Sequence, residues 1–236
     1  MTYTSKFISK KELAKDTYMF TFKKPVGFEF EAGQFTSVFL PGYSDKNPRD
    51  HKHTFSIASS PTDNEVQIAT RIRKTEFKSG LMKLKKGTEV QLGHPGGSMT
   101  LPEDMEISIV FLVGGIGITP VRGMLRYIAA KKKNYKIKVI YSNKKKKTTA
   151  FFDELTEEYD KFDNIEIVLT MTDEKGWQGE KGRINKKLIE KVVGNIPDNL
   201  FYVVGSELFN EKMSDILVKA GVKVEDIKSE TFFGYD

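Results

Sequence analysis

The pattern of apolar and polar residues changes character near residue 104. Before this point, short apolar stretches alternate with turns rich in Pro, Gly, Asn and Asp. Short strands separated by such breakers are typical of an antiparallel β-barrel or sandwich. The expected strands are 17–22, 35–40, 54–58, 66–72 and 89–92, and one short helix is expected near 80–84.

After this point the pattern alternates between strand and helix. The expected strands are 107–113, 137–141, 165–170, 200–204 and 227–232, and the expected helices are 120–131, 152–159, 186–193 and 207–220. Such alternation predicts a parallel sheet with helices on both faces. We therefore predict two domains, an antiparallel β-barrel over residues 1–103 and an α/β domain over residues 104–236.

A glycine-rich segment follows the first strand of the predicted α/β domain. The apolar run Val110–Val113 leads into Gly114, Gly115 and Gly117, and then into Thr119-Pro120. Thr is a good helix N-cap and Pro suits the first helical position, so a helix is expected to begin here. Bare amides and the positive end of a helix dipole form an anion site. The segment predicts a phosphate or dinucleotide site at the carboxyl end of a central strand, with a tight structural turn as the alternative.

The amino-acid composition argues against several kinds of functional site, so we expect none of them. The 236 residues include no Cys and three His, so we expect no disulfide, iron–sulfur centre, metal site or cysteine nucleophile. We find no signal-peptide pattern and no apolar run of membrane-spanning length, which predicts a cytoplasmic protein. The net charge is +6, and the clustered lysines are either a surface for an acidic partner or solvated helix ends and loops. No nucleic-acid motif accompanies them.

The predicted barrel has its own group of functional side chains. On the strand around Phe55, a period of two places His53 and Phe55 on one face and Thr54 and Ser56 on the other. Barrel turns with surface arginines are the alternative interpretation. Other segments of the predicted barrel that carry candidate functional residues are Gly33-Gln34, Arg71, Lys78-Ser79-Gly80 and Pro95-Gly96-Gly97.

Together these segments resemble the ferredoxin–NADP reductase family of flavoproteins. The family's R-x-Y-S/T motif corresponds to His53–Ser56, and its G-G-x-G-x-T-P loop corresponds to Gly114–Pro120. The matches run in family order along nearly the whole chain. The remaining matches are Gly33-Gln34, Pro95-x-Gly97, Trp177-x-Gly179 with Gly182-Arg183-Ile184, and the ending Glu230–Tyr235.

The resemblance implies how the barrel holds a flavin, with FAD expected over FMN on family grounds. It implies that Phe55 packs on the isoalloxazine ring and that Ser56 bonds the nitrogen that accepts hydride. His53 stands where the family has an arginine that contacts the flavin phosphate, and a neutral histidine can still donate a hydrogen bond there. Other expected flavin contacts are Thr54, Arg71, and the amides of Lys78, Ser79 and Gly80 at a helix N-terminus.

The resemblance also implies a nicotinamide nucleotide site in the α/β domain. Gly114, Gly115 and Gly117 would hold the pyrophosphate, with Thr119 near the nicotinamide. The family's C-G-P turn is here Val204-Gly205-Ser206, which keeps the glycine Gly205 and lacks the other two residues.

Three further positions complete the expected nucleotide and flavin contacts. Ser142 and Lys144 could hold a ribose phosphate, which favours NADPH over NADH, with a solvated lysine turn as the alternative. Glu230 is either a proton-handling group or a surface glutamate. Phe232, Phe233 or Tyr235 either covers the flavin or packs in the core, and Phe233 is the expected flavin contact.

The resemblance implies an FAD-dependent oxidoreductase in which Ser56, Thr119 and Glu230 are the catalytic candidates. Hydride would pass from NADPH or NADH to FAD, and electrons would pass on to ferredoxin, flavodoxin, free flavin, a quinone or a ferric chelate. Three alternatives stay open. They are a flavin-binding subunit without its own activity, which the Val204-Gly205-Ser206 turn favours, a lysine-rich binding module without flavin, and a reductase that uses flavin as a substrate.

Overall fold

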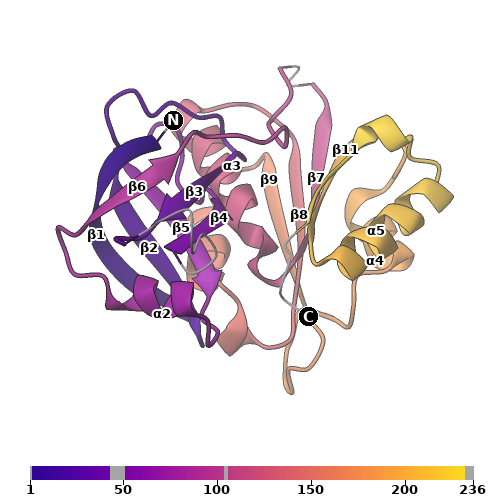
Figure 1. Ribbon diagram of the computed structural model, residues 1–236. Coiled ribbons are helices and arrows are strands. Elements are labelled where there is room, and N and C mark those ends of the chain that lie inside the picture. Colours follow the sequence, from indigo (N-terminus) through magenta and orange to yellow (C-terminus); the bar gives the residue numbers. More distant parts are fainter. Residues whose placement is uncertain (1, 43–50, 104–105, 232–236) are drawn as a thin grey trace. The chain divides into compact units, whose positions relative to one another are not determined.

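The computed structural model describes residues 2–42, 51–103 and 106–231, and the chain divides into two compact units (Figure 1). The first unit consists of Met1–Leu101 and Thr119–Lys131. The second consists of Pro102–Ile118 and Lys132–Asp236. Among the helices of the described residues, none is both long and apolar enough to cross a membrane.

The first unit contains the predicted antiparallel barrel, drawn in indigo to magenta in Figure 1. Its sheet has the strand order β4-β3-β6-β1-β2-β5, and a bridge between Ile57 and Ile68 joins the ends of this order. The strands are β1 Thr2–Ala14, β2 Thr17–Lys23, β3 Phe35–Phe39, β4 Lys52–Ser56, β5 Glu65–Arg71 and β6 Glu89–Gly93. The prediction missed β1 because most of its side chains are polar and lie outside the core.

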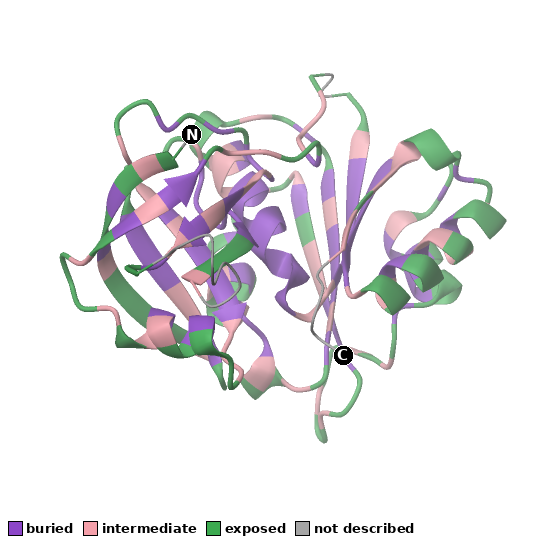
Figure 2. Cartoon of the chain, viewed as in Figure 1, coloured by how far each residue is buried: buried purple, intermediate pink, exposed green. Residues whose placement is uncertain are grey.

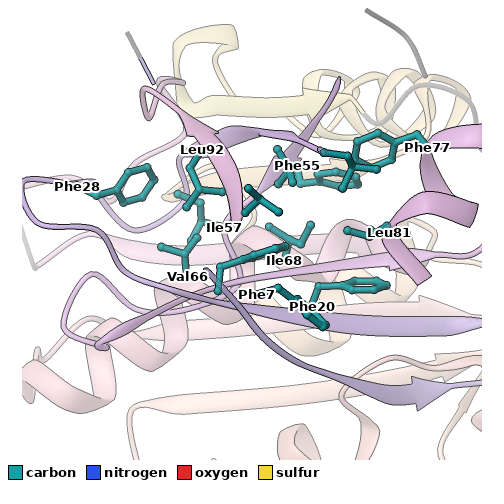
Figure 3. Packing of buried hydrophobic residues seen from close by; sticks show 14 of the residues in the cluster. Phe7, Phe20, Phe28, Phe55, Ile57, Val66, Ile68, Phe77, Leu81 and Leu92 are labelled. Carbon is teal, nitrogen blue, oxygen red and sulfur yellow. The ribbon is translucent and has the colours of Figure 1, made fainter. Parts of the chain in front are cut away.

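Aromatic and branched side chains fill the barrel (Figure 3). Helix α2, Glu76–Lys83, adds Phe77 and Leu81, which lie four residues apart and therefore share one helix face. Thr75 caps this helix through its hydroxyl, which accepts a hydrogen bond from the Lys78 amide. The helix expected near 80–84 therefore begins a full turn earlier than predicted.

Helix α3, Ile118–Lys131, contributes two arginines to the first unit. The buried Arg122 donates from Nη1 to the Ala58 carbonyl at 2.8 Å and to Gln67 Oε1 at 2.9 Å. Arg126 makes two hydrogen bonds of 3.2 Å to the Asp63 carboxylate. These contacts attach α3 to the segment that follows β4.

We expect Arg122→Leu to lower the free energy of unfolding by about 1.5–3 kcal/mol, because the buried Ala58 carbonyl and the half-buried Gln67 side chain lose a charged hydrogen-bond donor. Arg126→Leu is the matched control one turn further along α3. The ion pair of Arg126 with Asp63 is partly exposed, so the loss of this pair lowers the free energy of unfolding by at most about 1 kcal/mol. Denaturant unfolding of both variants checks the difference, and equal losses would contradict it.

The second unit contains the predicted parallel sheet, in the order β10-β9-β8-β7-β11-β12. Figure 2 shows the central strands buried along most of their length. Helices α4, Lys186–Val193, and α5, Glu207–Lys219, pack on one face. On the other face, the Tyr141 hydroxyl donates to the Ala150 carbonyl. The strands are β7 Ser108–Gly114, β8 Ile137–Asn143, β9 Ile165–Met171, β10 Glu180–Lys181, β11 Asn199–Gly205 and β12 Ile227–Thr231.

Two helix predictions in this half of the chain are wrong in detail. The expected helix 152–159 is a short π-helical turn, Glu154–Glu158, whose closely spaced carboxylates disfavour an α-helix. Thr119 is not the N-cap of α3, because a 3₁₀ turn over Gly115–Gly117 continues directly into the helix at Ile118. Pro120 is still accommodated, since a first-turn residue needs no N–H bond. Two further 3₁₀ turns are Lys146–Thr148 and Val224–Asp226.

Candidate functional site

In the first unit, three aromatic rings gather where β4 meets α2. The rings of His53 and Phe55 stack with centroids 5.0 Å apart, which confirms that these two side chains share a face. Phe77 lies 5.5 Å from His53 and 5.8 Å from Phe55, and Figure 3 shows Phe55 and Phe77 together at one end of the core. His53 is exposed while the two Phe residues are buried. The cluster thus has an aromatic surface toward solvent.

The other face of β4 is anchored to the turn before β3. The Thr54 and Ser37 hydroxyls lie 2.9 Å apart, and Ser56 is buried. Gly33 has a φ of +102°, and a Cβ atom there would lie 2.0 Å from the Met99 carbonyl oxygen. Only glycine therefore fits this turn, which holds the end of β4 through the Ile57 amide, 2.9 Å from the Gln34 carbonyl.

The expected phosphate contact through the amides of Lys78, Ser79 and Gly80 needs correction. These residues do not form the start of α2, because the helix begins at Glu76. The Lys78 amide already donates to the Thr75 hydroxyl, and the Ser79 amide donates to the Thr75 carbonyl at 2.9 Å. Ser79 and Gly80 instead border a groove of about 390 Å³, with His51 and Glu76 among its other lining residues.

Three cations lie close together at the junction of β5 and α2. Lys78 is buried, and its Nζ donates to the Arg71 carbonyl at 2.5 Å. Burial, together with the positive charges of Arg73 and Arg71, lowers the pKa of Lys78 to about 8. The sequence pointed only to the backbone amide of Lys78, because its side chain comes beside Arg71 and Arg73 only in the fold.

The lowered pKa of Lys78 predicts a pH-dependent stability. Between about pH 8 and 10.5 the unfolded chain keeps a proton that the folded chain has lost, so the free energy of unfolding rises with pH across this window. Below about pH 8 the folded protein carries the full cost of the buried charge. We therefore expect the melting temperature of the wild type to rise relative to that of Lys78→Met as the pH increases through the window. Parallel melting curves would contradict this.

In the second unit, the glycine-rich turn lies where the strand order of the sheet reverses. Strands β8 and β9 follow β7 on one side, whereas β11 and β12 lie on its other side. This reversal is the switch point at which parallel α/β sheets bind ligands, outside the carboxyl ends of the strands. The turn Gly115–Gly117 starts directly after β7, so its backbone lies at this place. Thr119, two residues further, is buried.

Glycine is favoured at each of these positions for a different physical reason. Gly115 has a φ of +54° and open space where a side chain would be, so it leaves room for a ligand. A Cβ atom at Gly117 would lie 2.4 Å from the Val204 carbonyl oxygen. At Gly114 and Gly205, the added atom would instead meet the ring of Phe209, at 3.2 and 2.5 Å.

The loop after β8 carries Ser142, which is half-buried, and Lys144, which is exposed. Residues 142–150 contain no acidic side chain, but the fold brings two from the loop after β9. The Asp173 carboxylate lies 3.2 Å from Lys145 Nζ, and Glu174 accepts a hydrogen bond from the Lys146 amide at 2.6 Å. These carboxylates offset part of the positive charge that favoured NADPH.

The last predicted contacts lie at the end of the chain. Glu230 is half-buried in β12, and its backbone carbonyl accepts a hydrogen bond of 2.9 Å from Asn210 Nδ2 on α5. Phe232, Phe233 and Tyr235 lie outside the described residues.

Comparisons with known proteins agree with this architecture. The family model of the oxidoreductase NAD-binding domain matches residues 111–215. The chain is 28% identical to an NAD(P)H-flavin reductase of Vibrio harveyi over 80% of this chain and 81% of that protein. It is 23% identical to a glycine betaine monooxygenase reductase subunit of Pseudomonas aeruginosa, over 92% of this chain and 60% of that protein. It spans about half the length of two curated flavohemoproteins that it also matches.

The fold is also that of solved reductases. The structure of a ferredoxin–NADP⁺ reductase from Neisseria gonorrhoeae superposes with a TM-score of 0.84 at 18% identity, covering 98% of this chain and 99% of that one. The shared fold consists of a β-barrel unit and a parallel α/β unit with a glycine-rich turn at its switch point. The family model, the curated relatives and the fold together support a ferredoxin–NADP reductase-like family of FAD- and NAD(P)-binding oxidoreductases for this chain.

Proposed function

We propose that this protein is an NAD(P)H-dependent flavin oxidoreductase that holds FAD in its barrel unit and passes electrons to an external acceptor. The observation that carries this proposal is the open Gly115 backbone at the switch point, inside the segment that the NAD-binding family model matches. The name of the Vibrio harveyi relative supports the same activity. Bound flavin would supply the step from a two-electron donor to one-electron acceptors.

The barrel unit has groups that fit a phosphorylated flavin. The rings of His53, Phe55 and Phe77 form an aromatic cluster that is exposed at His53, and Ser56 lies next to Phe55 on β4. Burial lowers the pKa of Lys78, and repulsion from the nearby charges of Arg73 and Arg71 adds to this effect. A flavin phosphate would relieve this repulsion and favour the charged form of Lys78. We propose His53 and Thr54 as additional contacts at the solvent side of the cluster.

In the second unit, the backbone of Gly115 would face the pyrophosphate of the nicotinamide nucleotide. Ser142 and Lys144 would meet the adenosine ribose at the end of β8. Asp173 and Glu174 weaken the electrostatic preference for a ribose phosphate there. We therefore propose that both NADPH and NADH serve as donors.

Charge is distributed unevenly along the chain. Residues 1–101 contain 16 Lys and Arg against 10 Asp and Glu, whereas residues 102–236 contain 22 of each. The net positive charge therefore belongs to the part of the chain proposed to hold the flavin. This favours an acidic electron-carrier protein, such as a ferredoxin or flavodoxin, as acceptor, with free flavin as the second candidate.

Two measurements on the purified protein test this function. The first identifies the flavin released by heat and asks whether dialysis removes it. The second follows oxidation of NADH and of NADPH with free FAD, free FMN or an acidic ferredoxin as acceptor. Tightly held FAD with turnover on the protein carrier supports the proposal. Loss of flavin on dialysis with turnover only on added flavin favours a flavin-substrate reductase, and bound flavin without turnover favours a subunit without its own activity.

A further inference from the structure

An aromatic side chain lies at the switch point of the second unit. Strands β7 and β11 are neighbours, and they end at Gly114 and Gly205. The ring of Phe209, from the first turn of α5, lies against the backbone of both glycines. An added Cβ atom would come within 3.2 Å of this ring at Gly114 and within 2.5 Å at Gly205.

Space for the Phe209 ring, and not backbone conformation, favours glycine at these two positions. Gly114 has φ −115° and ψ 122°, an extended conformation open to any residue, and Gly205 has no positive φ. The missing side chains therefore make room for the Phe209 ring. Gly115 is different, because its φ is positive and the space beside it is open.

The ring is held firmly but is not fully covered. Phe209 packs on the hydrophobic cluster between the sheet and helices α4 and α5, yet it remains half-buried. Its amide donates to the Ser206 hydroxyl, the N-cap of α5, at 3.4 Å. The next residue, Asn210, attaches the same helix turn to β12 through the Glu230 carbonyl. A partly exposed ring is thus fixed in place between the strand ends.

We propose that Phe209 is a positioning residue for the nicotinamide nucleotide, and that Gly114 and Gly205 are glycines because they seat its ring. The inference rests on the proposed function and adds a residue to that site. The exposed part of the ring forms an apolar wall at the ends of β7 and β11, against which the bound nucleotide rests. Partial burial of such a ring by a ligand contributes about a tenfold gain in affinity.

Equilibrium titration of the flavin-loaded protein with NADP⁺ and with NAD⁺ tests whether the Phe209 ring contributes to nucleotide affinity. We expect Phe209→Ala to raise Kd about tenfold and Phe209→Leu, which keeps an apolar side chain, to stay within about threefold of the wild type. Leu208→Ala is the control, since its side chain is exposed on the same helix turn. An unchanged Kd in Phe209→Ala overturns the inference, as does an equal loss in Leu208→Ala.

A double-mutant cycle tests the role of the glycine. If Gly114 only seats the ring, Gly114→Ala weakens binding in the wild-type background and has no further effect when Phe209 is already Ala. Equal losses in both backgrounds would mean that the ligand itself needs the glycine, and would overturn this assignment. Binding of neither nucleotide by the wild type would instead overturn the proposed function, and the inference with it.

Discussion

Replacing Gly117 by alanine is expected to lower the affinity for NADH and NADPH about a hundredfold. The added Cβ atom would lie 2.4 Å from the carbonyl oxygen and 2.8 Å from the carbonyl carbon of Val204. Both atoms belong to the backbone of a central strand, so the turn Gly115–Gly117 must move outward. Overpacking of this kind costs about 1–3 kcal/mol, and displacement of the turn misplaces the backbone that would face the pyrophosphate. Nucleotide titration and denaturant unfolding measure the two effects.

Gly176→Ala is the matched control for this substitution. Gly176 lies in the same unit, has a positive φ of +78° and has no atom within 4 Å of an added Cβ. It should therefore cost about 1 kcal/mol of stability through its backbone alone and leave nucleotide affinity unchanged. If Gly117→Ala bound nucleotides as well as this control, the turn would have no part in the site.

Replacing Ser56 by alanine is expected to slow reduction of bound flavin about ten- to hundredfold while most flavin binding is retained. Ser56 is buried at the end of β4, directly after Phe55. In the proposed site its hydroxyl bonds the flavin atom that accepts hydride, and loss of one preorganised polar group at a reacting atom has an effect of this order. Rapid mixing of the anaerobic protein with NADPH or NADH measures the rate.

Ser5→Ala separates the loss of a buried hydroxyl from the loss of function. Ser5 is a buried barrel serine whose hydroxyl donates to the Lys23 carbonyl at 2.6 Å. Its replacement should lower stability and leave the rate of flavin reduction unchanged. A normal rate in Ser56→Ala, or an equal loss in both variants, would remove Ser56 from the proposed chemistry.

The sequence predicted both sheets because each has a strong local pattern. The strand β7 is apolar from Ile109 to Val113, as expected of a strand buried on both faces, and a glycine-rich turn follows it. The strand β1 was not predicted because few of its side chains lie in the core, so it shows no clear apolar pattern. Phe7 is nevertheless buried among the barrel aromatics. The start of α3 was misplaced because Thr119 and Pro120 are typical of a helix start. In the structure the helical conformation begins earlier, with the 3₁₀ turn over Gly115–Gly117.

The functional positions that the sequence missed depend on contacts between distant residues. Asp173 reaches the loop after β8 only because β9 pairs with β8, and nothing near Lys145 in the sequence signals it. Phe209 looks like an ordinary core residue of an amphipathic helix. Only the parallel pairing of β7 with β11 places its ring on Gly114 and Gly205. Local patterns predict elements, whereas these contacts arise from the order of strands in the sheet.

The measurement that tests the proposed function most directly is the visible absorbance of the purified, anaerobic protein before and after addition of NADH or NADPH. We expect flavin bands at the start that bleach within seconds with either nucleotide and return when an acceptor is added. Flavin bands that persist with both nucleotides, or a protein that shows no such bands even after FAD is supplied, would contradict it.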